Sequence, residues 1–195
     1  MDPATWIIKD PQINARGAKS CLIENSAPQV GSDAKIRFFL GGRVEPSSTP
    51  FGATSWGDEV TTRKTIEFNV SPAQEAKFAE ITTWAQEYLA KHSERIFRKA
   101  MSVEQVADSF RPPVTKRGDY RPHLRCKINT SGTGAVRCWD AGGVSVPLPP
   151  DLKNYKLVPR IMLSHLWCMA RECGFVMVVT DLQLIEGEID TCPFH

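Results

Sequence analysis

The stretch RPHLRCKINTSGTGAVRCWD, from Arg121 to Asp140, has the clearest strand pattern of the chain. Apolar and polar residues alternate on either side of the Gly-rich segment Ser131–Gly134, as they do in strands with one buried face. The apolar set is Leu124, Cys126, Ile128, Val136 and Cys138. The opposite set is His123, Arg125, Lys127, Asn129, Arg137 and Trp139. The pattern predicts a hairpin whose apolar face is buried and whose other face carries cations and an indole ring.

Such a face suits a polyanion with planar rings. Lysine and arginine attract phosphates, and a tryptophan ring stacks on nucleobases, so single-stranded nucleic acid is the ligand that this pattern indicates. The alternative is a half-exposed strand whose basic residues are simply solvated.

The remaining composition places limits on the class of protein. The chain has 195 residues, 42% of them apolar, and a net charge of +2. This is enough for one domain with a core, which we expect over residues 35–195 after an irregular lead-in, residues 1–34. No apolar run reaches the roughly 18 residues of a membrane helix, so no membrane partner is expected. The six cysteines form no CxxC pair, which indicates reduced thiols inside a cell.

Charge is segregated along the chain. Between Lys91 and Arg137 there are 11 Lys and Arg against 4 Asp and Glu, a local charge of +7, while the rest of the chain has −5. A basic segment within a nearly neutral protein favours a polyanionic partner. Solvated helix and loop surface is again the alternative.

The expected elements are mostly strands. A helix should begin after Ser71, with Gln74 completing a capping box, and end near Lys91. A short helix is expected over Val103–Phe110, before Pro112. The strands are expected over Lys35–Leu40, Arg63–Val70, His123–Thr130 and the long hairpin Leu157–Glu186, which turns at Arg171–Gly174. A helix over His165–Arg171 is the competing interpretation. The fold class is therefore mainly β with helical insertions (α+β), as a small antiparallel barrel of the OB type.

The chain shows no catalytic signature, and we expect a protein that is not an enzyme. GxSxG, HExxH and Walker-type motifs are missing. Four residues could supply zinc ligands, although the spacing of the first two is at the limit of the usual range: Cys168, Cys173, Cys192 and His195. We expect neither a metal nor a cofactor.

The expected binding residues are cations with interleaved aromatic rings. They are Arg98, Lys99, Lys116, Arg117, Tyr120, Arg121, Arg125, Lys127, Arg137, Trp139 and Trp167. Phe51 and Trp56, in a long polar loop, are further candidates for clamping a strand. These side chains would contact the phosphates and the flat faces of the bases rather than the base edges, so binding is expected to tolerate any sequence.

The order of elements resembles a known family. The anchors are Arg125-Cys126-Lys127-Ile128 and the segment Val158–Phe175, within residues 60–186. They resemble the single-stranded-DNA-binding proteins of nucleocytoplasmic large DNA viruses, the group that includes the poxvirus replication protein. The layout is also similar to that of the OB-fold helix-destabilising proteins of some phages. The resemblance implies coating of single-stranded DNA in replication, recombination or repair of a viral genome, in the host cytoplasm (the viral factory) or nucleus. The partners that it implies are single-stranded DNA, with RNA, replication proteins and self-association as further ones.

Two other classes of function stay open at this stage. A viral structural, assembly or interaction module without DNA-binding activity is the first. A nuclease is the second, with Asp140, Asp181, Glu186 and Glu188 as its candidate carboxylates.

Overall fold

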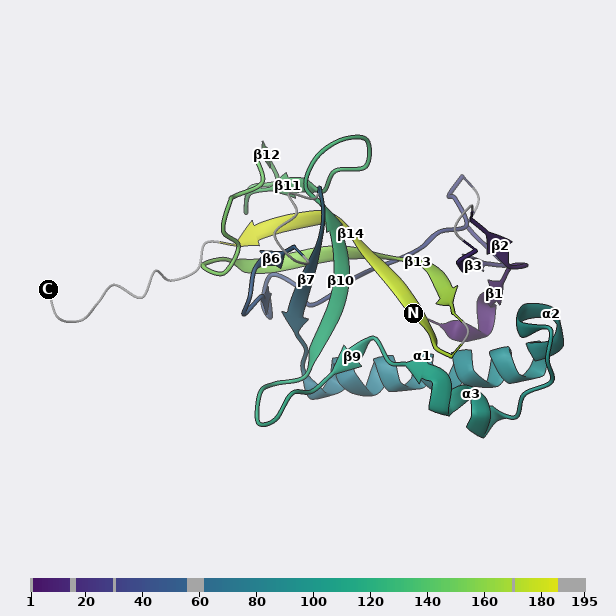
Figure 1. Ribbon diagram of the computed structural model, residues 1–195. Coiled ribbons are helices and arrows are strands. Elements are labelled where there is room, and N and C mark those ends of the chain that lie inside the picture. Colours follow the sequence, from purple (N-terminus) through teal and green to yellow (C-terminus); the bar gives the residue numbers. More distant parts are fainter. Residues whose placement is uncertain (1, 15–16, 30, 56–61, 170, 186–195) are drawn as a thin grey trace, which may run out of the picture. The chain divides into compact units, whose positions relative to one another are not determined.

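The apolar segment near the C-terminus forms a long β-hairpin, as predicted. In the computed structural model, which describes residues 2–14, 17–29, 31–55, 62–169 and 171–185, strand β13 (Lys156–Cys168) neighbours β14 (Cys173–Ile185) in the sheet (Figure 1). The N–H of Met169 donates to the carbonyl of Glu172 over 2.8 Å and closes the turn, which lies slightly before the expected one. The competing helix over residues 165–171 is wrong, because β13 continues to Cys168.

The chain divides into two units, each of which is built from three segments. The first unit comprises residues 1–37, 71–115 and 162–177, and the second comprises residues 38–70, 116–161 and 178–195. Strands β4 (Ile36–Phe39), β13 and β14 contribute residues to both. The other elements of the first unit are η1 (Pro3–Thr5), β1 (Trp6–Ile8), β2 (Gln12–Ile13), β3 (Lys19–Asn25), α1 (Pro72–Lys91), α2 (Ser93–Phe97), α3 (Val103–Ser109), β8 (Phe110–Arg111) and β9 (Val114–Thr115). Those of the second are β5 (Ser47–Ser48), β6 (Ala53–Thr54), β7 (Arg63–Asn69), β10 (His123–Asn129), β11 (Arg137–Trp139) and β12 (Ser145–Val146).

Helix α1 of the first unit begins with the predicted capping box. The N–H of Gln74 donates to Ser71 Oγ over 3.3 Å, and the N–H of Ser71 donates to Gln74 Oε1 over 2.7 Å. The buried stripe of the helix is Phe78, Ile81, Ala85 and Leu89. Over the part of the chain that the structure describes, no helix has the length and apolar character needed to cross a membrane.

Replacing Ser71 by alanine should lower the free energy of unfolding by about 1 kcal/mol, because one of the first N–H groups of α1 loses its acceptor. A denaturant titration followed by far-ultraviolet circular dichroism measures the change. Ser71→Gly is the matched control and should cost only a few tenths of a kcal/mol. An alanine variant as stable as the wild type would contradict the capping role.

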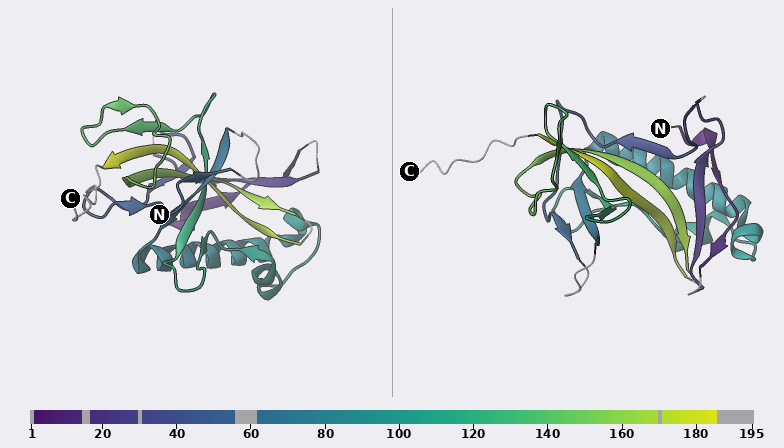
Figure 2. Two further views of the ribbon diagram at one scale, coloured as in Figure 1. Left: turned by 60° about the vertical axis from the view of Figure 1, so that its left-hand side comes forward. Right: turned by 90° about the horizontal axis from the view of Figure 1, so that it is seen from above.

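The expected irregular lead-in is folded instead, so that expectation is wrong for residues 6–8 and 19–25. Strand β3 pairs with β13 through Cys21 and Leu166, and β1 pairs with β3 (Figure 2). Trp6 is buried against Trp84 of α1, with ring centroids 5.4 Å apart. The apolar patches were too short to show a strand, and pairing with β13 supplies the missing stability. The expected domain boundary at residue 35 stays a prediction.

The sheet of the second unit is not the expected closed antiparallel barrel. Its hydrogen-bonded path leads from β6 through β7, β10 and β14 to β13 and β5. Among the described residues, no backbone pairing joins β5 to β6 or β7. A side-chain hydrogen bond of 2.9 Å, from Asn69 Nδ2 to Ser48 Oγ, lies between β7 and β5 instead. The mainly β class with helices is confirmed, whereas closure into a barrel is not.

Strands β10 and β11 do not form the predicted hairpin. Both run parallel to β14: Lys127 lies opposite Val178, and Arg137 lies opposite Asp181. The loop between them leaves β10 and leads back to β14, with which β11 then pairs. At its base the N–H of Val136 donates to the carbonyl of Asn129 over 2.9 Å. Because glycine adopts the left-handed conformation without strain, Gly134, at φ +94°, suits this return. The predicted alternation is nevertheless correct for the five apolar side chains of the opening stretch, which are buried. His123, which was expected on the exposed polar face, is also buried, because its ring packs beside the carboxylate of Glu67.

Candidate nucleic-acid interface

A row of polar side chains crosses three strands of the second unit. The strand register places Thr65 of β7 opposite Thr54 of β6 and Lys127 of β10. Cross-strand partners project from the same side of a sheet, and Lys127 Nζ donates to Thr65 Oγ1 over 3.0 Å. The neighbouring pair Ile66 and Cys126 faces the other way and is buried. The polar row therefore lies on the outer side of the sheet.

The next outward pair is Arg125 and Glu67, which lie opposite each other. Glu67 is 9% exposed, and its two carboxylate oxygens contact Arg117 Nη2 at 3.3 Å and His123 Nε2 at 3.4 Å. A buried carboxylate needs such partners. Glu67 therefore holds Arg117, which comes from the loop before β10, beside the strand residues. We refer to the outward side chains of Thr54, Thr65, Glu67, Arg117, Arg125 and Lys127 as the β7–β10 face.

The β7–β10 face is hollowed beside an aromatic ring. A hollow of about 290 Å³ is lined by Arg117, Arg125 and two threonines, and Phe51, whose side chain is 44% exposed, contributes to its wall. Partial burial lowers the pKa of Lys127, and the nearby charges of Arg125 and Arg63 lower it further. An anion bound here would reduce this repulsion. The face thus combines three cations and one carboxylate with hydroxyl groups, and the Phe51 ring lies beside it.

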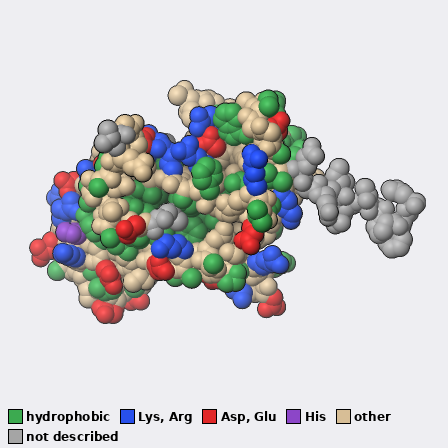
Figure 3. All heavy atoms as spheres, turned by 180° about the vertical axis from the view of Figure 1, so that it is seen from behind, with side chains coloured by type: hydrophobic (Ala, Val, Ile, Leu, Met, Phe, Trp, Pro, Cys, Tyr) green, Lys and Arg blue, Asp and Glu red, His purple; other side chains and the backbone are tan. Residues whose placement is uncertain are grey.

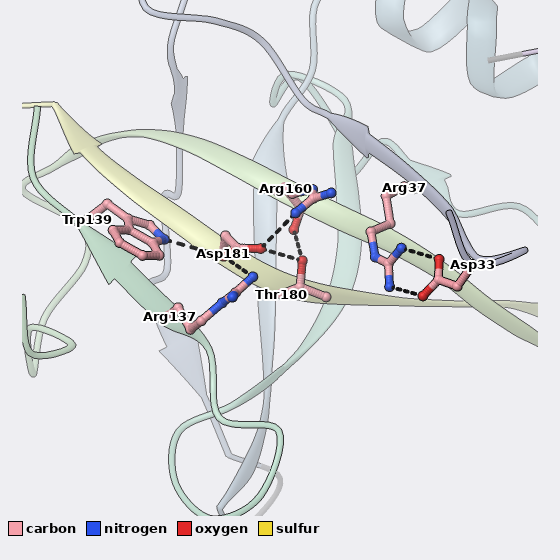
Figure 4. Close-up of polar contacts among 7 residues, drawn as sticks. All are labelled: Asp33, Arg37, Arg137, Trp139, Arg160, Thr180 and Asp181. Carbon is pink, nitrogen blue, oxygen red and sulfur yellow. Dashed lines mark hydrogen bonds and ion pairs between the residues drawn. The ribbon is translucent and has the colours of Figure 1, made fainter. Parts of the chain in front are cut away.

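The second predicted pair, Arg137 and Trp139, surrounds a carboxylate on β14. Arg137 Nη2 lies 2.7 Å from Asp181 Oδ1, and Trp139 Nε1 donates to the same oxygen over 3.3 Å (Figure 4). Arg160 of β13 approaches the other oxygen at 3.7 Å. The guanidinium carbon of Arg137 lies 6.0 Å from the centre of the Trp139 ring. Arg137 and Trp139 share a face, as predicted, and both are held by Asp181.

The position of Asp181 follows from a change in the alternation of β14. Its buried side chains are Met177 and Val179 in one part of the strand and Leu182 and Leu184 in the next. The change places Asp181 on the same side as its neighbour Arg137. The sequence signal was a lone carboxylate in the apolar run VMVVTDLQLI, which the nucleic-acid interpretation did not use. Arg160, in KLVPRIML, is the corresponding lone cation.

The other predicted residues fall into two groups. Lys116, Tyr120 and Arg121 lie on the exposed loop before β10 in the second unit, where Tyr120 is 74% exposed. Arg98, Lys99 and Trp167 belong to the first unit. These three thus belong to a different unit from the residues of the β7–β10 face, and their role in binding stays a prediction. Trp167 is half-buried, and its ring lies against the backbone of Gly174 across the hairpin.

The excess charge of residues 91–137 is also divided between the two units and partly paired. Ion pairs join Arg95 to Asp10 and Arg111 to Glu172 in the first unit. Seen from behind, the surface has Lys and Arg side chains interspersed with Asp and Glu (Figure 3). The charge that is segregated along the sequence is therefore distributed over both units.

The features considered for metal-dependent chemistry are only partly described. Glu186, Glu188, Cys192 and His195 lie outside the described residues, and so does Trp56, the residue suggested for clamping a strand. Asp181 is engaged by two arginines, and Asp140 accepts the N–H of Val144 over 2.8 Å. Within the described part of the chain, no group of three or more His, Cys, Asp or Glu side chains is placed to hold a metal ion.

Comparison with known proteins shows a shared fold. No family model matches the chain, and no curated protein sequence matches it. Among solved structures, the fold is similar to that of a phage protein. This is gp2.5, a single-stranded DNA binding protein encoded by bacteriophage T7, with a TM-score of 0.51 and 14% identity, over 78% of this chain and 87% of gp2.5. The similarity agrees with the phage layout noted in the sequence, while the affiliation with large DNA viruses stays a prediction.

Proposed function

We propose that this chain binds single-stranded DNA without sequence preference. The observation that carries the proposal is the β7–β10 face, where Arg117 and Arg125 line a hollow walled by Phe51, and Lys127 donates to Thr65, another residue of its lining. A groove with cations for phosphates and exposed rings for bases is the usual construction of a sequence-tolerant single-strand site. The fold that the chain shares with gp2.5 of bacteriophage T7, itself a single-stranded DNA binding protein, supports the proposal.

The biological setting that we propose rests on the sequence resemblance. The sequence resemblance favours a non-catalytic role in replication, recombination or repair of a viral genome, in the cytoplasm or nucleus of the host. RNA and replication proteins are the further partners that this role implies.

Fluorescence anisotropy with a labelled 30-nucleotide oligothymidylate, and with a duplex of equal length, tests the proposal. We expect tight binding to the single strand and weaker binding to the duplex. Affinity should fall as salt rises from 50 to 200 mM, because lysine and arginine side chains that bind phosphates release the counterions condensed on the DNA. Binding to neither form at low salt would overturn the proposal and would favour an interaction module instead. Cleavage of the DNA with Mg²⁺ would favour a nuclease.

The double variant Arg125→Ala, Lys127→Ala should flatten the salt dependence. Each phosphate contact with a single strand contributes about 0.7 to the slope of log K against log salt, so the slope should fall by about 1.4. Lys9→Ala combined with Lys77→Ala is the control, because it removes the same charge from ion pairs of the first unit. If both doubles change the slope equally, net charge rather than the β7–β10 face is responsible.

A further inference from the structure

Two aromatic rings of the second unit are each accompanied by an arginine, and the two arginines meet at one carboxylate. Arg137 lies by Trp139, as described above. The guanidinium carbon of Arg160 lies 5.9 Å from the centre of the Phe39 ring. Arg160 and Arg137 come from β13 and β11 and approach the two oxygens of Asp181 on β14 (Figure 4). A pair of one arginine and one aromatic ring thus occurs twice around Asp181. The sequence analysis selected only the ring of Trp139 as a stacking candidate from these two pairs.

Asp181 fixes this arrangement. Only 8% of the residue is exposed, and a carboxylate buried to this extent must be fully paired. Besides its contacts with Arg137, Arg160 and Trp139, it accepts a hydrogen bond of 2.9 Å from Thr180 Oγ1. The same hydroxyl lies 3.2 Å from the carbonyl of Arg160, so its single O–H is shared between the two acceptors, and the strand carrying the second arginine lies beside the same point. The Trp139 ring and the two guanidinium groups are therefore held in place before a ligand arrives.

The arginines remain available to a ligand. Their side chains are 61% and 38% exposed, for Arg137 and Arg160 respectively. A guanidinium group has five N–H donors, so one contact with Asp181 leaves others for phosphate oxygens. Two arginines against one aspartate leave a net charge of +1. The cluster thus offers planar rings and positive charge together.

Phe39 is the exposed member of the cluster. It lies at the end of β4, next to Leu40, whose N–H donates to the carbonyl of Pro159 on β13 over 3.0 Å. The backbone is thereby fixed, yet 64% of Phe39 is exposed. A ring that is carried on a fixed backbone and is open on its surface can stack on a base with less loss of conformational freedom than a ring on a mobile loop.

We infer that Phe39 with Arg160 is a second base-stacking position for single-stranded nucleic acid, which Asp181 holds in register with Trp139 and Arg137. The inference rests on the proposed function, because it names a further ligand-binding residue for the same partner.

The experiment compares oligothymidylate with an abasic oligonucleotide of the same length. The abasic strand keeps the phosphates and lacks the bases, so a stacking residue contributes only to the thymidine strand. Phe39→Ala should weaken binding to oligothymidylate roughly 5- to 20-fold and should leave binding to the abasic strand within about twofold of the wild type. Phe39→Trp should keep the wild-type affinity, and Phe39→Leu, which is apolar without a ring, should behave like alanine.

Val44→Ala is the matched control, since Val44 is a 95% exposed apolar residue of the same unit outside the cluster. An equal loss on both oligonucleotides, no loss on either, or full affinity in Phe39→Leu would overturn the stacking assignment. If Arg125→Ala, Lys127→Ala flattens the salt dependence while Phe39→Ala changes nothing, only the second position fails. If the wild type binds neither strand, the proposed function fails and the inference fails with it.

Discussion

Replacing Phe68 by alanine is expected to lower the free energy of unfolding by about 3–5 kcal/mol, the usual cost of removing a large aromatic side chain from a core. Phe68 is fully buried on the inner side of β7, opposite Leu124 of β10. The neighbouring inward pair, Ile66 and Cys126, is also buried. The cavity left by the ring would therefore lie between packed side chains that can only partly close it.

A denaturant titration of the variant and the wild type measures this loss. Phe39→Ala is the matched control, because the same side chain is removed from a position that is 64% exposed, and it should change the free energy of unfolding by less than about 1 kcal/mol. Equal stability of Phe68→Ala and the wild type would show that β7 and β10 do not enclose the core as described.

This core prediction concerns function as well as stability. Glu67 and Asn69 flank Phe68 and point outward, where Glu67 holds Arg117 at the β7–β10 face. The β7–β10 face therefore exists only while the inner side of the same strands is packed. Weak DNA binding by Phe68→Ala would have to be measured below its unfolding transition before it is read as a loss of contacts.

Local features of the fold could be predicted from the sequence because they depend on neighbouring residues. The capping box at Ser71 and Gln74 satisfies its own N–H groups, and the alternation from Leu124 to Ile128 needs only one buried side. Strand partners are different. The Gly-rich loop after Asn129 is compatible with a hairpin and equally with a return to the same edge, and the choice depends on pairing with β14, about 50 residues further along the chain.

The candidate site was predictable to the same extent. Alternation correctly placed Arg125, Lys127 and Arg137 outside the core. Sequence proximity suggested that Arg98 and Lys99 would join them, but these residues fold into the first unit. The carboxylates Glu67 and Asp181 were not predicted as part of the nucleic-acid site, because such a site is recognised in a sequence by its cations and aromatic residues. Their role of orienting arginines becomes visible only when the strands are paired.

The proposed binding role of Trp139 leads to the second large expected effect. Trp139→Ala should weaken binding to single-stranded DNA by about 1–3 kcal/mol, the usual contribution of one base stacked on an aromatic ring. The ring is half-buried and accompanied by Arg137, and its N–H is already held by Asp181, so it is oriented before the DNA binds. Anisotropy titration with oligothymidylate measures the change, and circular dichroism verifies that the variant is folded.

Trp139→Phe separates stacking from the hydrogen bond to Asp181. Phenylalanine keeps a ring in the same place and removes the N–H that donates to Asp181 Oδ1. If the ring face binds the base, this variant should keep most of the affinity that alanine loses. If phenylalanine and alanine weaken binding equally, Trp139 acts by positioning Asp181 and its arginines rather than by stacking. Wild-type affinity in Trp139→Ala would remove Trp139 from the interface and leave the β7–β10 face as the binding surface.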